Sequence, residues 1–271
     1  MEKLRKYGEK PFNVAVIHGG PGAPGEMAPV AKELSSESGI LEPLQTESSI
    51  KGQLQELRSV LKKHGDKSVI LIGYSWGAWL SYILAAKYPS LVRKLILVGS
   101  GPFTEKYASE IMETRFNRLN KEEKREVNLL MEKLNDSNNN MEKDLARLGK
   151  LMSKADSFDP LPSNKIEYVD FQQEIYRKVW NEASELRKSG KLLEYGKQIE
   201  CPVIAIHGDY DPHPNEGVKE PLSQVVEDFK LILLNNCGHT PWIERNAKND
   251  FYRIIKKEIK VRGDTNGKNN Y

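Results

Sequence analysis

The sequence contains few cysteines. Cys201 and Cys237 are the only two in 271 residues, and neither lies in a CxxC or Cys/His spacing typical of metal ligands. Two cysteines also exclude the disulfide framework that holds many small secreted domains together. We therefore expect no metal site and no structural disulfide, and we expect reduced thiols, as in the cytoplasm.

The sequence also lacks long apolar runs and a strong charge of one sign. No stretch approaches the roughly 18 apolar residues of a membrane-spanning helix, and the N-terminal MEKLRKYGEKPF has no apolar segment typical of a signal peptide. The net charge of +3 indicates neither nucleic acid nor an anionic membrane as partner. We expect a soluble cytoplasmic protein that acts on a small molecule, and the oligomeric state is left open.

Short apolar runs alternate with segments of helical spacing in two parts of the chain. Apolar residues make up 38% of the sequence and charged residues 29%, which suits a packed core under a solvated surface. Nearly continuous apolar strands are typical of a parallel sheet covered on both faces. The sequence therefore predicts an α/β fold with a mostly parallel sheet of about six strands, flanked by helices. The predicted strands are 13–17, 39–44, 68–73, 94–99, 202–208 and 230–234, and the predicted helices are 28–38, 50–64, 76–88, 215–228 and 243–260.

A segment of different character separates these two parts. Residues 103–199 are dense in mixed charge and helical in pattern, with a loop or disordered break at 135–140. We expect residues 1–102 and 200–262 to form one α/β core, the intervening residues to form a helical cap, and residues 263–271 to form a disordered tail. One predicted cap helix carries apolar residues at three- and four-residue steps: Tyr168, Phe171, Ile175, Val179, Ala183 and Leu186.

The serine with the most informative surroundings is Ser75. It lies in Gly73-Tyr-Ser-Trp-Gly77, after a predicted strand and before a predicted helix. G-x-S-x-G in this position is the pattern of a sharp turn that exposes a nucleophile, with glycines where side chains would clash. Such a turn also directs a backbone N–H and the helix N-terminus toward the reacting group. Taken alone, the motif also fits a small residue in an ordinary tight turn.

A second motif, His18-Gly-Gly-Pro-Gly22, follows the first predicted strand. Its glycines would let backbone N–H groups approach a developing oxyanion. We predict that the N–H groups of Gly20 and Trp76 form an oxyanion hole. The alternative is a Gly/Pro turn without a ligand.

Two further motifs supply an acid and a histidine. HGDYDPHP follows a later strand and offers Asp211, with Asp209 as the rival carboxylate, and NNCGHTPW follows the last strand and offers His239. Because ligands bind beyond the carboxyl ends of parallel strands, these groups and Ser75 are expected at one edge of the sheet. The chain order Ser, Asp, His is the order expected for this architecture.

Together these motifs resemble those of the α/β-hydrolase family, over residues 12–103 and 200–260. HGGPG and GYSWG are similar to the proline iminopeptidase branch, and the inserted helices look like the cap of that family. The resemblance implies Ser75 as nucleophile, His239 as general base and acid, and Asp211 as its orienting partner. It also implies an oxyanion hole formed by Gly20 and Trp76, and no cofactor.

The sequence departs from the family pattern in two places. Only about a dozen residues, rich in charge, precede the first predicted strand, where family members usually have two further strands. We therefore expect a trimmed sheet. Tyr74 stands where many iminopeptidase-like members have a small residue, which loosens the tie to that activity.

Aromatic residues near the motifs are candidates for an acyl pocket, with ordinary core packing as the alternative. These residues are Tyr74, Trp79, Phe103 and Trp242. We expect His18 and His207 to be structural and Cys237 to be a buried, inert thiol.

We expect a serine hydrolase that cleaves a small carboxylic ester or amide through an acyl-enzyme intermediate. One alternative is an aminopeptidase that releases N-terminal proline. Another is a non-catalytic protein that binds a small ligand on the same fold, because a fold alone does not determine function.

Overall fold

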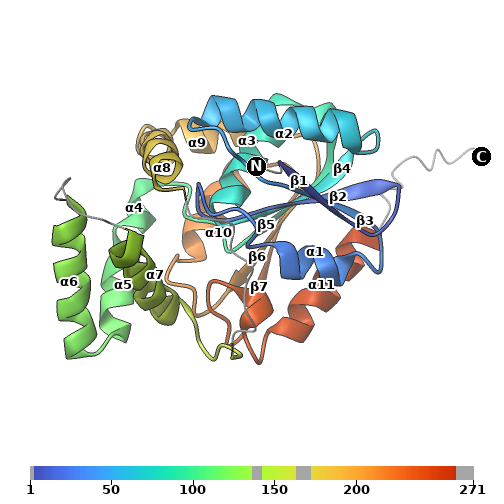
Figure 1. The fold of residues 1–271 in the computed structure, drawn as a ribbon. Helices are drawn as coiled ribbons and strands as arrows, with labels where there is room; N and C mark the ends of the chain where they lie inside the picture. The colour runs from blue at the N-terminus through green and yellow to red at the C-terminus, as the bar shows by residue number, and fades with distance from the viewer. Residues whose placement is uncertain (1–2, 136–141, 163–171, 261–271) are drawn as a thin grey trace, which may run out of the picture.

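A seven-stranded sheet forms the centre of the computed structural model, which describes residues 3–135, 142–162 and 172–260 (Figure 1). The strand order is β1-β3-β2-β4-β5-β6-β7, and every neighbouring pair is parallel except β1 with β3. The predicted α/β fold with a mostly parallel sheet is therefore confirmed. The strands are β1 (Leu4–Tyr7), β2 (Phe12–Ile17), β3 (Gly39–Pro43), β4 (Val69–Tyr74), β5 (Val92–Val98), β6 (Val203–Gly208) and β7 (Phe229–Leu234).

The sheet has one strand more than the apolar runs indicated. β1 lies within the charged N-terminal segment and pairs antiparallel with β3, with Leu4 opposite Pro43 and Tyr7 opposite Ile40. Its side chains are half-buried or exposed, as suits an edge strand, so it has no apolar run that would reveal it. The Tyr7 hydroxyl donates to the buried Glu42 carboxylate at 2.6 Å and ties this strand to the sheet.

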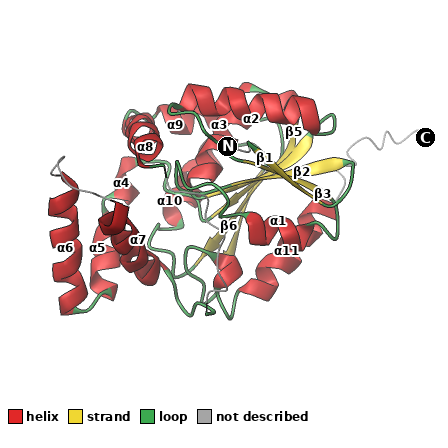
Figure 2. Cartoon of the chain, in the orientation of Figure 1, coloured by secondary structure: helices red, strands yellow, loops and turns green. Residues whose placement is uncertain are grey.

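Helices cover both faces of the sheet (Figures 1 and 2). Alternate strand residues point to opposite faces: Val14 and Val16 pack in one apolar cluster, and Ala15 and Ile17 in the other. The first cluster includes α1 (Ala28–Leu34) and α11 (Lys248–Lys260), and the second includes α2 (Ile50–His64), α3 (Trp76–Lys87) and α10 (Glu216–Val225). Short 3-10 turns lie at η1 (Pro89–Leu91) and η3 (Pro241–Ile243). This sandwich presents the carboxyl ends of the parallel strands at a single edge.

A helical insertion lies between β5 and β6. α5, α6 and α7 share a small apolar cluster of their own and stand to one side of the sheet (Figure 1), whereas α8 packs Val179 and Ala183 into the main core. The assignment of 103–199 as a separate cap stays a prediction, and most of the 135–140 break and the whole 263–271 tail fall outside the described residues. The helices are α4 (Glu105–Ala108), α5 (Glu110–Arg118), α6 (Lys121–Asn135), α7 (Glu142–Asp156), α8 (Gln173–Lys188) and α9 (Lys191–Glu194), followed by the 3-10 turn η2 (Tyr195–Gln198).

None of the helices found in the described ranges combines the length and the apolar character that a bilayer crossing requires.

Candidate active site

Ser75 lies at the turn between β4 and α3. Its φ of 51° and ψ of −115° lie in a region that non-glycine residues rarely adopt. A Cβ at Gly73 would lie 2.2 Å from the Gly77 carbonyl oxygen, and one at Gly77 would lie 2.4 Å from the His18 carbonyl oxygen. Both glycines are therefore required by backbone contacts. The turn leaves Ser75 partly exposed while the residues on either side of it are buried.

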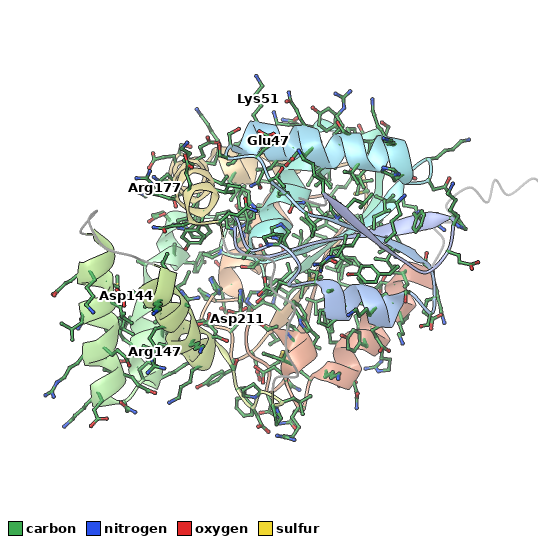
Figure 3. All side chains as sticks on the ribbon, in the orientation of Figure 1. Glu47, Lys51, Asp144, Arg147, Arg177 and Asp211 are labelled. Atoms are coloured by element: carbon green, nitrogen blue, oxygen red, sulfur yellow. The ribbon has the colours of Figure 1, made fainter. Side chains whose placement is uncertain are left out.

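His239 connects Ser75 with Asp211. The Ser75 hydroxyl lies 3.1 Å from His239 Nε2, and His239 Nδ1 lies 2.7 Å from Asp211 Oδ2. An ionised carboxylate can only accept hydrogen bonds, so Nδ1 carries the proton and Nε2 is left to accept from the serine. Asp211 lies in the interior of the molecule, between the sheet and the inserted helices (Figure 3). The structure thus brings these three predicted residues together.

Asp209, the rival carboxylate, faces elsewhere. Its Oδ1 accepts the backbone N–H of Cys237 at 3.1 Å, so it braces the start of the His239 loop. Burial raises the pKa of the Cys237 thiol, as expected for an inert cysteine. His18 is also buried, with Nδ1 2.6 Å from the Gly19 carbonyl oxygen, and burial lowers its pKa to about 4.

Three imidazoles surround the Asp211 carboxylate. Besides His239, the backbone N–H and ring Nδ1 of His213 lie 2.9 and 2.8 Å from Oδ1, and His207 Nε2 lies 3.5 Å from Oδ2. Burial raises the pKa of Asp211, but the charges of these histidines and the His213 hydrogen bond lower it well below the ordinary 3.8. Asp211 is therefore ionised at neutral pH. Sequence reasoning did not select His213; the signal available was its place two residues after an aspartate that forms a turn.

The charge on Asp211 also acts on His239. Burial lowers the pKa of His239, but the Asp211 carboxylate, by its charge and its hydrogen bond, raises that pKa above the ordinary 6.5.

A second carboxyl, Glu26, was not selected from the sequence either. Burial raises the pKa of Glu26 to about 7, and the charge of His239 opposes this shift. Glu26 lies against the loop of residues 18–22, which we call the glycine-rich loop: a Cβ on Gly19 would be 2.6 Å from Glu26 Oε2.

The predicted oxyanion residues lie on two segments that flank Ser75. Gly20 has a φ of 22° and its carbonyl accepts the Ala23 N–H at 2.9 Å in a tight turn. Trp76 begins α3, and its indole N–H donates to Gln53 Oε1 at 3.1 Å. The indole is therefore occupied, and the predicted oxyanion donor is the backbone N–H of this residue. Because Gly77 contacts the His18 carbonyl directly, the start of α3 and the glycine-rich loop run in backbone contact.

The glycine-rich loop also contacts the insertion. The Gln172 N–H, just before α8, donates to the Gly22 carbonyl at 2.7 Å. A Cβ on Gly22 would lie 2.4 Å from the Gln172 carbonyl oxygen. The N-terminal end of α8 is therefore seated on the loop that carries Gly20.

The His239 loop is fastened to the middle of the insertion, where α7 ends. The His239 N–H donates to the Asp156 carbonyl at 2.8 Å. The fully buried Glu244 carboxylate accepts the Gly238 N–H at 3.1 Å and the N–H groups of Phe158 and Asp159 at 2.9 and 2.8 Å. We refer to Asp156, Glu244 and these amides as the loop clamp. Arg115 supports it through a bidentate pair with the Asp156 carboxylate, at 2.7 and 2.8 Å.

The four candidate aromatic residues differ in position. Tyr74 lies closest to the site, with its ring centre 5.1 Å from that of His239 and its hydroxyl 2.7 Å from Thr240 Oγ1. Phe103 and Trp242 are buried in the two core clusters. Their positions match the alternative of core packing. The Trp242 ring meets the Tyr74 ring edge-on, with ring centres 4.6 Å apart.

Trp79 begins a row of parallel rings. It is buried, donates its indole N–H to the Gly101 carbonyl at 3.1 Å, and stacks on Trp180 with ring centres 6.0 Å apart. Tyr176 follows at 6.2 Å from Trp180 and is partly exposed. This row runs from the core along α8 toward the surface.

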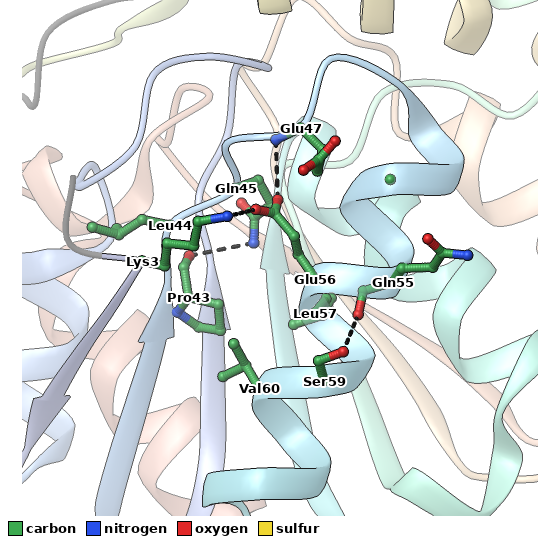
Figure 4. Close-up of a pocket in the computed structure, with 11 residues that line it drawn as sticks. Lys3, Pro43, Leu44, Gln45, Glu47, Gln55, Glu56, Leu57, Ser59 and Val60 are labelled. Atoms are coloured by element: carbon green, nitrogen blue, oxygen red, sulfur yellow. Dashed lines mark hydrogen bonds and ion pairs between the residues drawn. The ribbon is translucent and has the colours of Figure 1, made fainter.

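Two cavities in the described structure are lined by other residues. One, of about 400 Å³, surrounds Glu56, whose carboxylate accepts from Lys3 Nζ at 3.0 Å and from the backbone of Thr46 and Glu47 (Figure 4). The hydrogen bonds that fill this carboxylate make it an anchor for the N-terminal segment. The other, of about 870 Å³, is a groove between α2 and α8. Neither is lined by Ser75 or His239.

The site also holds potential metal ligands. One ligand atom each from Asp211, His213 and His239 lie within 4.8 Å of one another. Both Nδ1 atoms that face the carboxylate carry the protons of its hydrogen bonds, so a metal ion would first have to displace them.

Comparison with known proteins gives one family match. Residues 45–245 match the family model described as the alpha/beta hydrolase fold. A proline iminopeptidase from Thermoplasma volcanium is 23% identical over 287 aligned positions, which cover 95% of this chain and 93% of that protein. The proline iminopeptidase PfmaB from Pestalotiopsis fici is 27% identical over 189 positions, which cover 67% of this chain and 64% of PfmaB, slightly less than two thirds of its length.

Solved structures share the fold at low sequence identity. VinJ superposes with a TM-score of 0.68 at 16% identity, covering 94% of this chain and 93% of VinJ. A monoacylglycerol lipase from Paleococcus ferrophilus superposes with a TM-score of 0.62 at 15% identity, covering 96% of this chain and 98% of the lipase. At such identities these structures are evidence of a common fold alone.

Proposed function

Because the chain belongs to the α/β-hydrolase fold family, we propose that it is a serine hydrolase that cleaves small carboxylic esters or amides through an acyl-enzyme intermediate. One observation carries the proposal. A continuous line of hydrogen bonds runs from the partly exposed Ser75 hydroxyl through His239 to the ionised Asp211. A nucleophile, a base and a group that orients the base are the parts that acyl transfer requires.

The reaction proceeds in two steps. Ser75 Oγ attacks the carbonyl carbon while its proton moves to His239 Nε2, and Asp211 stabilises the resulting imidazolium. The N–H groups of Gly20 and Trp76 bind the oxyanion, each contributing roughly 3–4 kcal/mol to transition-state stabilisation by analogy with measured oxyanion-hole donors. His239 then protonates the leaving alcohol or amine. Water, deprotonated by His239 Nε2, then attacks the acyl carbon. The bond from that carbon to Ser75 Oγ breaks, His239 returns the proton to Oγ, and the acid leaves.

The pH dependence follows from the state of His239. Only neutral His239 can take the serine proton, so activity is absent at low pH and rises with pH through the pKa of this residue. Asp211 raises that pKa above 6.5. We therefore expect the acid limb of kcat/KM to lie above pH 6.5, and a measured limb clearly below that value contradicts the assigned base.

Covalent labelling tests the nucleophile. A fluorophosphonate probe should label the wild type and the Ser59→Ala variant equally, since Ser59 is an exposed serine on α2, and should leave Ser75→Ala unlabelled. Turnover of short p-nitrophenyl esters should follow the same pattern. An unlabelled wild type, or equal labelling of Ser75→Ala, would sink the proposal and favour a non-catalytic binding protein.

A second candidate activity is the release of N-terminal proline. Two relatives carry proline iminopeptidase in their names, and HGGPG is present here. Proline amides with a free and a blocked amine separate the candidates. A peptidase of this type cleaves the first and ignores the second, whereas an esterase or amidase without an amine requirement tolerates the block.

A further inference from the structure

The Asp211 carboxylate serves two imidazoles, one on each oxygen. Oδ2 accepts from His239 Nδ1 at 2.7 Å, and Oδ1 accepts from His213 Nδ1 at 2.8 Å. Since the ionised carboxylate only accepts, His213 also carries its proton on Nδ1. The backbone N–H of His213 donates to the same Oδ1 at 2.9 Å, which closes an Asx turn from Asp211. His213 therefore holds the oxygen that His239 does not use.

The pKa values of the two imidazoles are shifted in opposite directions. Burial lowers the pKa of His213 to about 4, and the charge of His239 adds to this while Asp211 opposes it. The same carboxylate raises the pKa of His239. At neutral pH His213 is a neutral donor, and His239 is the imidazole that can gain a proton. Environments that separate two titratable groups in this way distinguish the base from its support.

Packing fixes the His213 ring as well. It lies against the His239 ring, with centres 4.5 Å apart and planes 30° apart. His207 Nε2 lies 2.7 Å from the His213 carbonyl oxygen and anchors its backbone. Charged groups also reach this pair from the insertion: Arg115 of α5 acts on both imidazoles, and Asp156 of α7 acts on His239. Glu26, which lies against the glycine-rich loop, interacts electrostatically with His239.

We propose that His213 is a positioning residue: it holds Asp211 so that Oδ2 faces His239, and thereby keeps His239 aligned with Ser75. The role in catalysis rests on the proposed serine hydrolase function, whereas the role in holding Asp211 does not. His213 acts through Asp211 and has no part in the bond changes at the substrate. Without its Nδ1–H, Oδ1 keeps only the backbone donor and the carboxylate can turn away from His239.

Two variants separate the hydrogen bond from the packing. His213→Asn keeps an N–H donor near the position of Nδ1 and loses the ring, whereas His213→Leu keeps the bulk and loses the donor. His64→Leu, at a half-buried position at the end of α2 and far along the chain from the site residues, is the control for loss of a histidine. Unfolding midpoints of all three variants show whether each is folded under the assay conditions.

The first measurement does not depend on hydrolase activity. Titration of the five ¹⁵N-labelled histidines by NMR follows His239 directly, with its signal assigned from a His239→Gln variant. In His213→Leu the pKa of His239 should fall, because Asp211 no longer faces it steadily, and in His213→Asn it should return toward the wild-type value. An unchanged or raised pKa of His239 in the folded His213→Leu variant overturns the proposal.

The second measurement is kinetic. In His213→Leu, kcat should fall about 10- to 100-fold, the range expected for one hydrogen bond to a charged group, with KM unchanged. His213→Asn should recover most of the loss. Equal losses in both variants, or a His213→Leu kcat within about threefold of wild type, contradict a positioning role. If wild type reacts with neither esters nor fluorophosphonate, the proposed function fails while the NMR comparison still decides the role of His213.

Discussion

Replacing Glu26 by glutamine should stabilise the protein at alkaline pH and have little effect in acid. The Glu26 carboxyl lies against the backbone of Gly19, and burial raises its pKa from 4.5 to about 7. No lysine or arginine forms an ion pair with Glu26 within the part of the chain that the structure describes. Near pH 6 the folded protein therefore keeps a proton on Glu26 that the unfolded chain releases.

The sign of the effect follows from this difference. A carboxyl whose pKa is higher in the folded than in the unfolded state does not change the free energy of unfolding at pH values below the unfolded pKa. It lowers that free energy increasingly as pH rises, until pH passes the folded pKa. With pKa values of 4.5 and about 7, this difference destabilises the fold by about 1 kcal/mol at pH 5 and about 3 kcal/mol at pH 8. Glutamine stays neutral, so the advantage of Glu26→Gln over wild type should increase by about 2 kcal/mol across this interval.

Urea unfolding of wild type and Glu26→Gln at pH 5 and pH 8, followed by circular dichroism, measures this difference. Glu9→Gln, at an exposed carboxylate in the N-terminal segment, is the control and should differ from wild type by the same amount at both pH values. A Glu26→Gln advantage that is equal at the two pH values, or larger at pH 5, refutes a raised pKa for Glu26 in the folded protein.

Four further substitutions test the site and its support. Asp211→Asn should lower kcat about 10³- to 10⁴-fold in steady-state ester hydrolysis, as loss of the orienting carboxylate does in other enzymes with this arrangement. Asp209→Asn should keep kcat within about threefold of wild type and lose about 1 kcal/mol in urea unfolding, since its carboxylate only accepts a backbone N–H. Gly77→Ala should lower stability by about 3 kcal/mol or prevent folding, because its Cβ would lie 2.4 Å from the His18 carbonyl oxygen; soluble yield and unfolding midpoint report this. Leu57→Ala, in the core under α2, should cost about 2–5 kcal/mol on unfolding and leave fluorophosphonate labelling of the folded protein unchanged.

Elements with a strong apolar pattern could be predicted from the sequence. β4 and β5 are buried along nearly their whole length, and their runs of valine, leucine and isoleucine reflect a sheet covered on both faces. β1 could not be predicted in this way, because its stability comes from backbone pairing with β3 and from the Tyr7–Glu42 hydrogen bond. Such contacts join residues more than thirty positions apart, so they produce no periodic pattern of apolar residues in the sequence of β1 itself.

The positions of Ser75 and His239 could be predicted for a similar reason. Each follows a strand directly, and the carboxyl ends of parallel strands meet at one edge. Asp211 was preferred over Asp209 by the family resemblance, whereas residue type alone left both open, because the choice depends on how the loop after β6 turns.

The roles of His213 and Glu26 were harder to foresee. Both lie in loops without periodicity, and each acquires its shifted pKa from burial against distant segments. Part of the predicted helix that begins at Tyr168 falls outside the described residues, so that part of the helix stays a prediction.

The loop clamp has a consequence for how this lineage could acquire new substrates. Residues 156–159, where α7 ends in the middle of the insertion, supply one carbonyl and two N–H groups to the His239 loop and to Glu244 beside it. A set of helices from another family member would keep His239 in place only if the segment after its equivalent of α7 offered the same three backbone groups at the same positions relative to Glu244 and His239. At the loop clamp, a change of the insertion that alters substrate specificity must therefore also keep the general base His239 in position. Change along α6 is freer, because that helix packs within the insertion's own cluster, away from the clamp.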